Sequence, residues 1–144
     1  MRMEPRISLI TLGVRDPALS AEFYTRLGFS RSQEASADVA FFQLAGGLVL
    51  ALYRRSHLFR DAGIEDTGAT FSGITLAHNT RSELEVDKLA AGFVGAGGHL
   101  VKPPHRTGWG GYIAYTADPD GHVWEIAFNP AWELDETGGL TLPA

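Results

Sequence analysis

The amino-acid sequence predicts an α+β fold in one domain, residues 1–144, made of two βαβββ modules. The first observation is a repeat, because Ile10-Thr11-Leu12 recurs as Ile74-Thr75-Leu76 and a helix-like segment follows each copy. The second is that each half ends in a glycine-containing turn and an apolar run, with Gly46-Gly47 before LVLALY and Gly121 before HVWEIAF. A length of 144 residues, 44% of them hydrophobic, suits one ordinary domain.

The first module covers residues 7–53. Alternating β-branched and apolar residues predict a strand over 7–14. A helix follows, because Asp16 is a suitable N-cap, Pro17 fits the first helical turn, and Gly28 ends the apolar spacing. Three short strands complete the module, over residues 29–34, 39–44 and 48–53.

The second module, residues 71–128, repeats this order after a polar linker over 54–70. A helix is predicted from Ser82 to Ala96, where Gly97-Gly98 ends it. Four strands are predicted over residues 72–78, 99–102, 111–117 and 123–128. Residues 129–144 show no periodicity and are predicted to form a C-terminal surface segment.

Composition excludes several classes of function. Lys and Arg number 12 against 17 Asp and Glu, a net charge of -5, so no general positive field attracts nucleic acid. Without cysteine, disulfides, thiolate metal sites and thiol nucleophiles are excluded. The sequence has no apolar signal segment at its start and no 18-residue apolar run, so we expect no membrane association and a cytoplasmic location.

Two segments resemble a known family. Asp118-Pro119-Asp120-Gly121 is a tight turn by its chemistry, and it lies within WGGYIAYTADPDGHVWEIAFNP, residues 109–130. Together with VRDPALSAEFYTRLGF, residues 14–29, this stretch resembles the vicinal oxygen chelate superfamily, which includes glyoxalase I, bleomycin-resistance proteins and extradiol dioxygenases. The resemblance implies two βαβββ units whose curved mixed sheet forms a ligand cleft, with helices on the convex side. It also implies a homodimer.

Metal-using members of this superfamily place His, Gln or Glu ligands at four cavity positions. The matching positions here are Leu9, Ala51, Gly73 and Glu125. Three of these residues offer no donor atom in their side chains, and one carboxylate does not hold a divalent ion. We therefore predict no cofactor, with a divalent metal supported only by Glu125.

Glu125 is the predicted catalytic residue, because it is the only acid on an otherwise apolar strand. A carboxylate in an apolar pocket suits a general base or a ligand anchor. The alternative is a remnant of a metal site whose carboxylate is now hydrogen-bonded by a neighbouring Thr, Tyr or Trp.

Five other residues are predicted to contact a ligand. Tyr53 shares a strand face with Ala51 and would form an aromatic wall. Trp109 lies among glycines that allow close approach, and His105 lies in the loop before it. Thr11 and Thr75 face the cavity by strand alternation. Aromatic residues on strands also pack in protein cores, so that alternative stays open.

The only basic cluster consists of Arg54, Arg55 and Arg60 with His57. These residues either bind an anionic substrate at the cleft entrance or lie in a solvated loop.

The sequence leaves three functions open. The first is a small-molecule-binding protein without the usual metal ligands, which binds an apolar or aromatic ligand in the cleft. The second is a lyase, isomerase or dioxygenase-like enzyme that uses Glu125 as a base or in a rearranged metal site. The third is a scaffold with an empty cleft.

Overall fold

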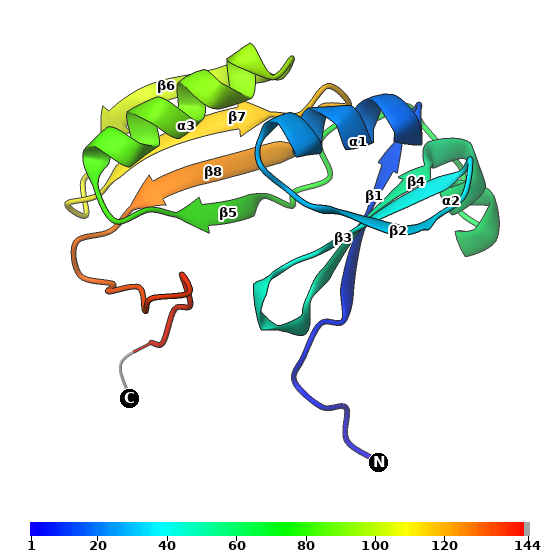
Figure 1. Ribbon diagram of the computed structural model, residues 1–144, viewed down its shortest axis with the longest axis horizontal. Helices are drawn as coiled ribbons and strands as arrows, with labels where there is room; N and C mark the ends of the chain where they lie inside the picture. The colour runs from blue at the N-terminus through cyan, green and yellow to red at the C-terminus, as the bar shows by residue number, and fades with distance from the viewer. Residues whose placement is uncertain (143–144) are drawn as a thin grey trace. The chain divides into compact units, whose positions relative to one another are not determined.

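The computed structural model describes residues 1–142, and of Glu34 and Ala35 only the backbone. The chain divides into two compact units, one spanning Met1–Thr67 and the other starting at Gly68. Each unit contains a four-stranded mixed sheet with βαβββ connectivity, as the sequence predicts (Figure 1).

The first sheet has the strand order β1-β4-β3-β2, in which β1 and β4 are parallel and the other pairs are antiparallel. A 3₁₀ turn over Ala45–Gly47, at the predicted glycine-containing turn, joins β3 to β4 as an antiparallel hairpin. The elements of this unit are β1 (Leu9–Val14), α1 (Pro17–Arg26), β2 (Arg31–Ala35), β3 (Val39–Gln43), β4 (Val49–Arg54) and α2 (Arg55–Ala62).

Helix α1 begins and ends where the sequence predicts. The Asp16 carboxylate accepts hydrogen bonds from the backbone N–H groups of Ala18 and Leu19, at 3.0 and 3.4 Å. Gly28 follows the helix with a φ of 102°, a conformation that glycine adopts without strain. The helix covers one face of the first sheet, and the aromatic core of this unit contains Phe23, Tyr24, Phe29 and Phe42.

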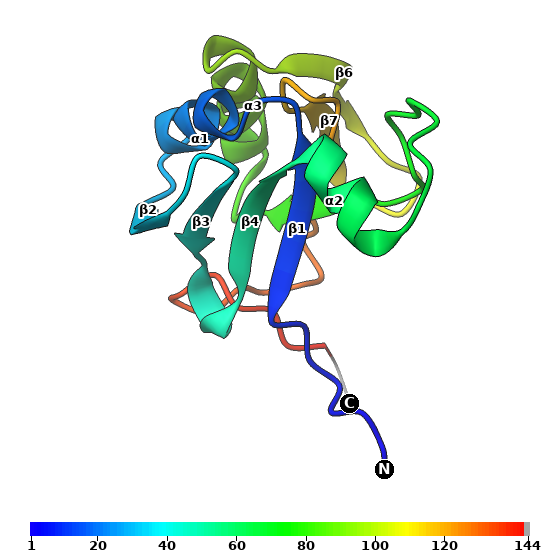
Figure 2. The same cartoon turned by 90° about the vertical axis from the view of Figure 1, so that its right-hand side faces the viewer.

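Helix α2 lies within residues 54–70, which were predicted to be a linker (Figure 2). No side chain caps its first turn, so a local start signal is missing. Contacts with distant residues hold it instead. Arg55 donates two hydrogen bonds to Asp66, at 2.7 and 2.8 Å, and a Cβ added to Gly13 would lie 3.3 Å from Leu58.

The second sheet has the order β5-β8-β7-β6, and β5 is parallel to β8. Ser82 caps α3 by accepting from the N–H of Glu85, while the Glu85 carboxylate accepts from the N–H of Arg81 at 2.7 Å. Phe93 of this helix packs against Trp124, with ring centroids 6.1 Å apart. The elements are β5 (Leu76–Asn79), α3 (Glu83–Gly95), β6 (His99–Arg106), β7 (Tyr112–Ala117) and β8 (Val123–Phe128).

Two strands of the second unit differ from their predicted bounds. The strand predicted over 72–78 begins only at Leu76, because Gly73 adopts a φ of 83° that interrupts extended backbone, and Ile74 is exposed. The strand predicted over 99–102 continues to Arg106 through Pro103 and Pro104. Prolines are tolerated there because β6 is an edge strand with irregular register.

The turn between β7 and β8 has the predicted chemistry. Asp118 is fully buried, and its Oδ1 accepts from the N–H groups of Asp120 and His122, both at 2.9 Å. Gly121 has a φ of 87°. The turn therefore fixes the register of β7 against β8, which places Tyr115 opposite Glu125.

Ser20 carries an unusual buried hydroxyl on α1. The residue is 2% exposed, and its Oγ makes no hydrogen bond with any described residue. A buried hydroxyl without a partner loses its hydration and gains nothing in return. Ser20 therefore destabilises the first unit relative to an apolar residue of similar size.

We expect Ser20→Ala to raise the free energy of unfolding by about 1 kcal/mol, because it removes the unpaired hydroxyl. Ser82→Ala is the matched control: this serine is bonded as an N-cap, and its loss should lower the same quantity by about 1 kcal/mol. Urea unfolding of both variants measures the two changes. A destabilised Ser20→Ala protein would contradict the assignment of an unpaired hydroxyl.

Candidate functional site

The first sheet has one face that α1 does not cover, which we call the open face of the first sheet. Strand pairing places Thr11 and Phe41 beside Ala51, and Gly13 beside Tyr53, on this face. Thr11 is exposed and Ala51 is buried, while Leu9 remains 49% exposed. The face is therefore mostly apolar, with a hydroxyl group on an outer strand.

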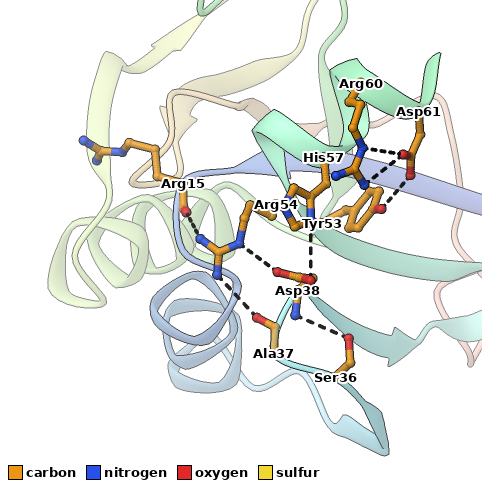
Figure 3. A network of polar contacts seen from close by, with 9 residues as sticks. All are labelled: Arg15, Ser36, Ala37, Asp38, Tyr53, Arg54, His57, Arg60 and Asp61. Atoms are coloured by element: carbon orange, nitrogen blue, oxygen red, sulfur yellow. Dashed lines mark hydrogen bonds and ion pairs between the residues drawn. The ribbon is translucent and has the colours of Figure 1, made fainter. Parts of the chain in front are cut away.

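Tyr53 is held in place by α2. Its Oη donates a hydrogen bond of 2.6 Å to Asp61 Oδ2, and Arg60 donates to the other oxygen of the same carboxylate (Figure 3). The bond to Asp61 raises the pKa of the Tyr53 phenol, which keeps it protonated. The ring is therefore a fixed aromatic surface whose hydroxyl is already engaged.

A second polar group joins the start of β3 to the start of α2. Arg54 Nε donates to Asp38 Oδ1 at 2.9 Å, and His57 Nδ1 lies 3.4 Å from Asp38 Oδ2 (Figure 3). The Arg54 hydrogen bond holds the pKa of the Asp38 carboxyl below its usual value.

The basic cluster predicted from the sequence is thus paired with acids. Arg54 pairs with Asp38, and Arg60 pairs with Asp61. Arg55 pairs with Asp66. These charges are compensated within the first unit, so the cluster does not present a free positive surface to an anion.

The open face of the second sheet carries Glu125. Since Trp124 packs under α3, strand alternation places Glu125 on the opposite face. Tyr115 lies directly across on β7, and its Oη donates a 3.3 Å hydrogen bond to Glu125 Oε2. Burial and the nearby Glu125 carboxylate raise the pKa of the Tyr115 phenol. Glu125 Oε1 accepts no hydrogen bond within residues 1–142.

Three more residues of the second unit were predicted to contact a ligand, and they lie in different elements. His105 lies opposite Ile113, on the same face as Glu125, and its Nδ1 donates to the Pro103 carbonyl at 2.8 Å. Trp109 is in the β6–β7 turn and is 57% exposed, with its indole folded over Gly111. Thr75 is exposed and precedes β5.

The structure thus brings some of the predicted residues together. Thr11 and Tyr53 share the open face of the first sheet, and Glu125 and His105 share that of the second. Two partners were not predicted from the sequence: Tyr115 for Glu125, and Asp61 for Tyr53. The first of these had a signal, because counting outward from the turn at Asp118 pairs Tyr115 with Glu125.

The residues do not fit a metal centre of the kind that the resemblance implies. Of the four matching positions, Leu9, Ala51 and Gly73 have no donor atom in their side chains. Among the side chains that the structure describes, no three of His, Asp or Glu gather closely enough to hold a metal ion. Within the same part of the chain, no helix is both long and apolar enough to cross a membrane.

A family model and solved structures both relate this chain to the same superfamily. Residues 6–126 match the model of the Glyoxalase/Bleomycin resistance protein/Dioxygenase superfamily. A solved glyoxalase-related enzyme from Fulvimarina pelagi is 39% identical with a TM-score of 0.88, covering 98% of this chain and 100% of its own. A glyoxalase/bleomycin resistance protein/dioxygenase from Nocardioides is 25% identical with a TM-score of 0.72, covering 99% and 93%. No match was found among curated proteins.

The pairing of Asp38 makes stability depend on pH. Its carboxyl has a lower pKa in the folded chain than its ordinary value of 3.8, so its stabilising effect is complete above that value. The effect is lost as the pH falls through the folded pKa. We therefore expect Asp38→Asn to reduce stability at pH 7 and to make progressively less difference below about pH 4.

Urea unfolding of wild type and Asp38→Asn at several pH values measures this convergence. Glu136→Gln is the control, because this exposed carboxyl makes no hydrogen bond with the described residues. A difference between wild type and Asp38→Asn that stays constant down to pH 2.5, an acid limit about one unit below the carboxyl's ordinary pKa, would contradict the role of the ionised carboxylate.

Proposed function

The chain belongs to the Glyoxalase/Bleomycin resistance protein/Dioxygenase superfamily, and from this premise we propose that it is a small-molecule-binding member. The ligand is apolar or aromatic and lies against an open sheet face. The observation that carries the proposal is the replacement of three of the family's four metal-ligand positions by Leu9, Ala51 and Gly73. These side chains favour contact with carbon over coordination of a cation.

The open face of the first sheet supports the apolar part of this proposal. Ala51 is buried between Thr11 and Phe41, so the centre of this face is apolar. Tyr53 lies two residues further along β4, and its bond to Asp61 fixes its ring. An aromatic ring held in place loses little conformational entropy when a flat ligand stacks on it.

The open face of the second sheet supports a polar anchor. Glu125 keeps Oε1 free of hydrogen bonds to the described residues, while Tyr115 orients the carboxylate through Oε2. Ile113 and Ala127 pair beside it on the same face and are buried, so the surroundings of the carboxylate are apolar. A ligand with one N–H or O–H donor on an apolar body matches this combination.

The same arrangement favours one alternative. A carboxylate that is oriented by a tyrosine and has a free oxygen can accept a proton, so Glu125 would act as the general base of a lyase or isomerase. Binding and catalysis are distinguished by whether the bound compound is converted to product.

We expect Tyr53→Ala to weaken binding of an aromatic ligand by about tenfold, because the variant loses the stacking surface. Tyr53→Phe is the matched control: it keeps the ring and loses only the hydrogen bond to Asp61, so its affinity should stay within about threefold of wild type. A thermal-shift screen of aromatic antibiotics identifies the ligand, and calorimetric titration gives the affinities.

Equal affinities of Tyr53→Ala and wild type would contradict the proposed wall. A compound that is turned over by wild type, and that Glu125→Gln binds but does not convert, would establish the enzymatic alternative in place of simple binding.

A further inference from the structure

A pocket of about 410 Å³ lies in the second unit, at the end of the sheet where the parallel strands β5 and β8 finish. Phe128 shares a strand face with Ile126, so this pocket lies away from the open face that carries Glu125. Its walls come from the residues after β5, the end of β8 and the C-terminal segment, and include Thr80, Arg81, Phe128, Asn129, Trp132 and Glu133.

Hydrogen bonds hold the C-terminal wall of this pocket. Arg81 Nη2 donates to the backbone carbonyl of Asp135 at 2.6 Å, which ties the segment to the start of α3. Leu134 and Leu140 form a β-bridge, and the loop between them is closed by the Asp135 carboxylate, which accepts from the N–H of Gly139 at 2.8 Å. The pocket is thus formed before any ligand binds, which lowers the entropic cost of binding.

The pocket offers an aromatic surface. Trp132 is 40% exposed and Phe128 is half-buried, although indole and phenyl groups favour burial. Both rings line the same cavity, whose volume falls in the range of sites for small organic molecules. A flat ring system would cover the surface that the two side chains leave open.

The polar groups of the pocket are mainly donors. Arg81 Nη2 uses one of its two N–H groups for the Asp135 carbonyl, which leaves its second N–H available beside those of Nε and Nη1. Asn129 accepts from the N–H of Ala131 through Oδ1, and its NH₂ group donates to no described residue. A guanidinium presents two parallel N–H groups that match a carboxylate. Glu133 is exposed and forms no hydrogen bond with the described residues, so it can turn to solvent.

We propose that this pocket binds a planar aromatic molecule that carries a carboxylate. The ring lies against Trp132 and Phe128, and the carboxylate accepts hydrogen bonds from Arg81 and Asn129. This site is separate from the open faces discussed above, so the two proposals succeed or fail independently.

The test uses the full chain labelled with ¹⁵N and three compounds with the same ring: 2-naphthoate, 2-naphthamide and 2-naphthamidine. We expect 2-naphthoate to shift the amide resonances of residues 80–81, 128–129 and 131–134 in a saturable way. The neutral amide and the cationic amidine should each bind at least tenfold more weakly, because neither carries a carboxylate for Arg81.

Variants assign the contacts. Arg81→Gln and Trp132→Ala should each weaken 2-naphthoate at least tenfold, and Trp132→Phe should recover most of the loss. Arg106→Gln, which removes an exposed arginine outside the pocket, should leave the affinity unchanged. Because Arg81 also holds the C-terminal segment, Glu133→Gln gives a second test that breaks no hydrogen bond, and it should bind 2-naphthoate as tightly as wild type or tighter.

Three results would overturn the proposal. One is equal binding of 2-naphthoate and 2-naphthamide. Another is preferred binding of 2-naphthamidine that Glu133→Gln abolishes, which would make this a cation site. The third is a shift of the pocket resonances with protein concentration alone, which would show that a second copy of the chain covers the pocket.

Discussion

The alternation of side chains along the strands is the constraint on which the rest of the structure depends. Each unit has one long helix packed on its sheet, so that helix covers one face only. Leu12 and Val14 point to the covered face of the first sheet, and Trp124 and Ile126 to that of the second. The intervening residues, including Ala51 and Glu125, lie on the other face of each sheet, which α2 partly covers in the first unit.

Local chemistry explains why most of the fold was predictable. Asp16 and Ser82 cap their helices within three residues, and Asp118 closes its own turn, so each signal lies next to the element it defines. Helix α2 was missed because its first turn has no side-chain cap and its contacts come from Asp66 and Gly13. Such tertiary contacts leave no periodic pattern in the sequence.

For the candidate site, the sequence predicted which sheet face each residue lies on, but not the hydrogen-bond partners. Strand parity placed Glu125 and Tyr53 on faces away from the long helices, and the structure agrees. Their partners followed from tertiary structure: Asp61 reaches Tyr53 only because α2 forms. The pocket lined by Trp132 could not be predicted, because residues after Phe128 show no periodicity and their fold depends on Arg81 and Asp135.

At the family's four ligand positions, the side chains of this chain do not suit a metal ion. Elemental analysis tests this most directly, on protein purified without chelator and then reloaded with nickel, zinc, iron or manganese. We expect far less than one bound ion per chain, because Glu125 is the only donor at those positions. One ion per chain in wild type, lost in Glu125→Gln, would show instead that these positions bind a metal.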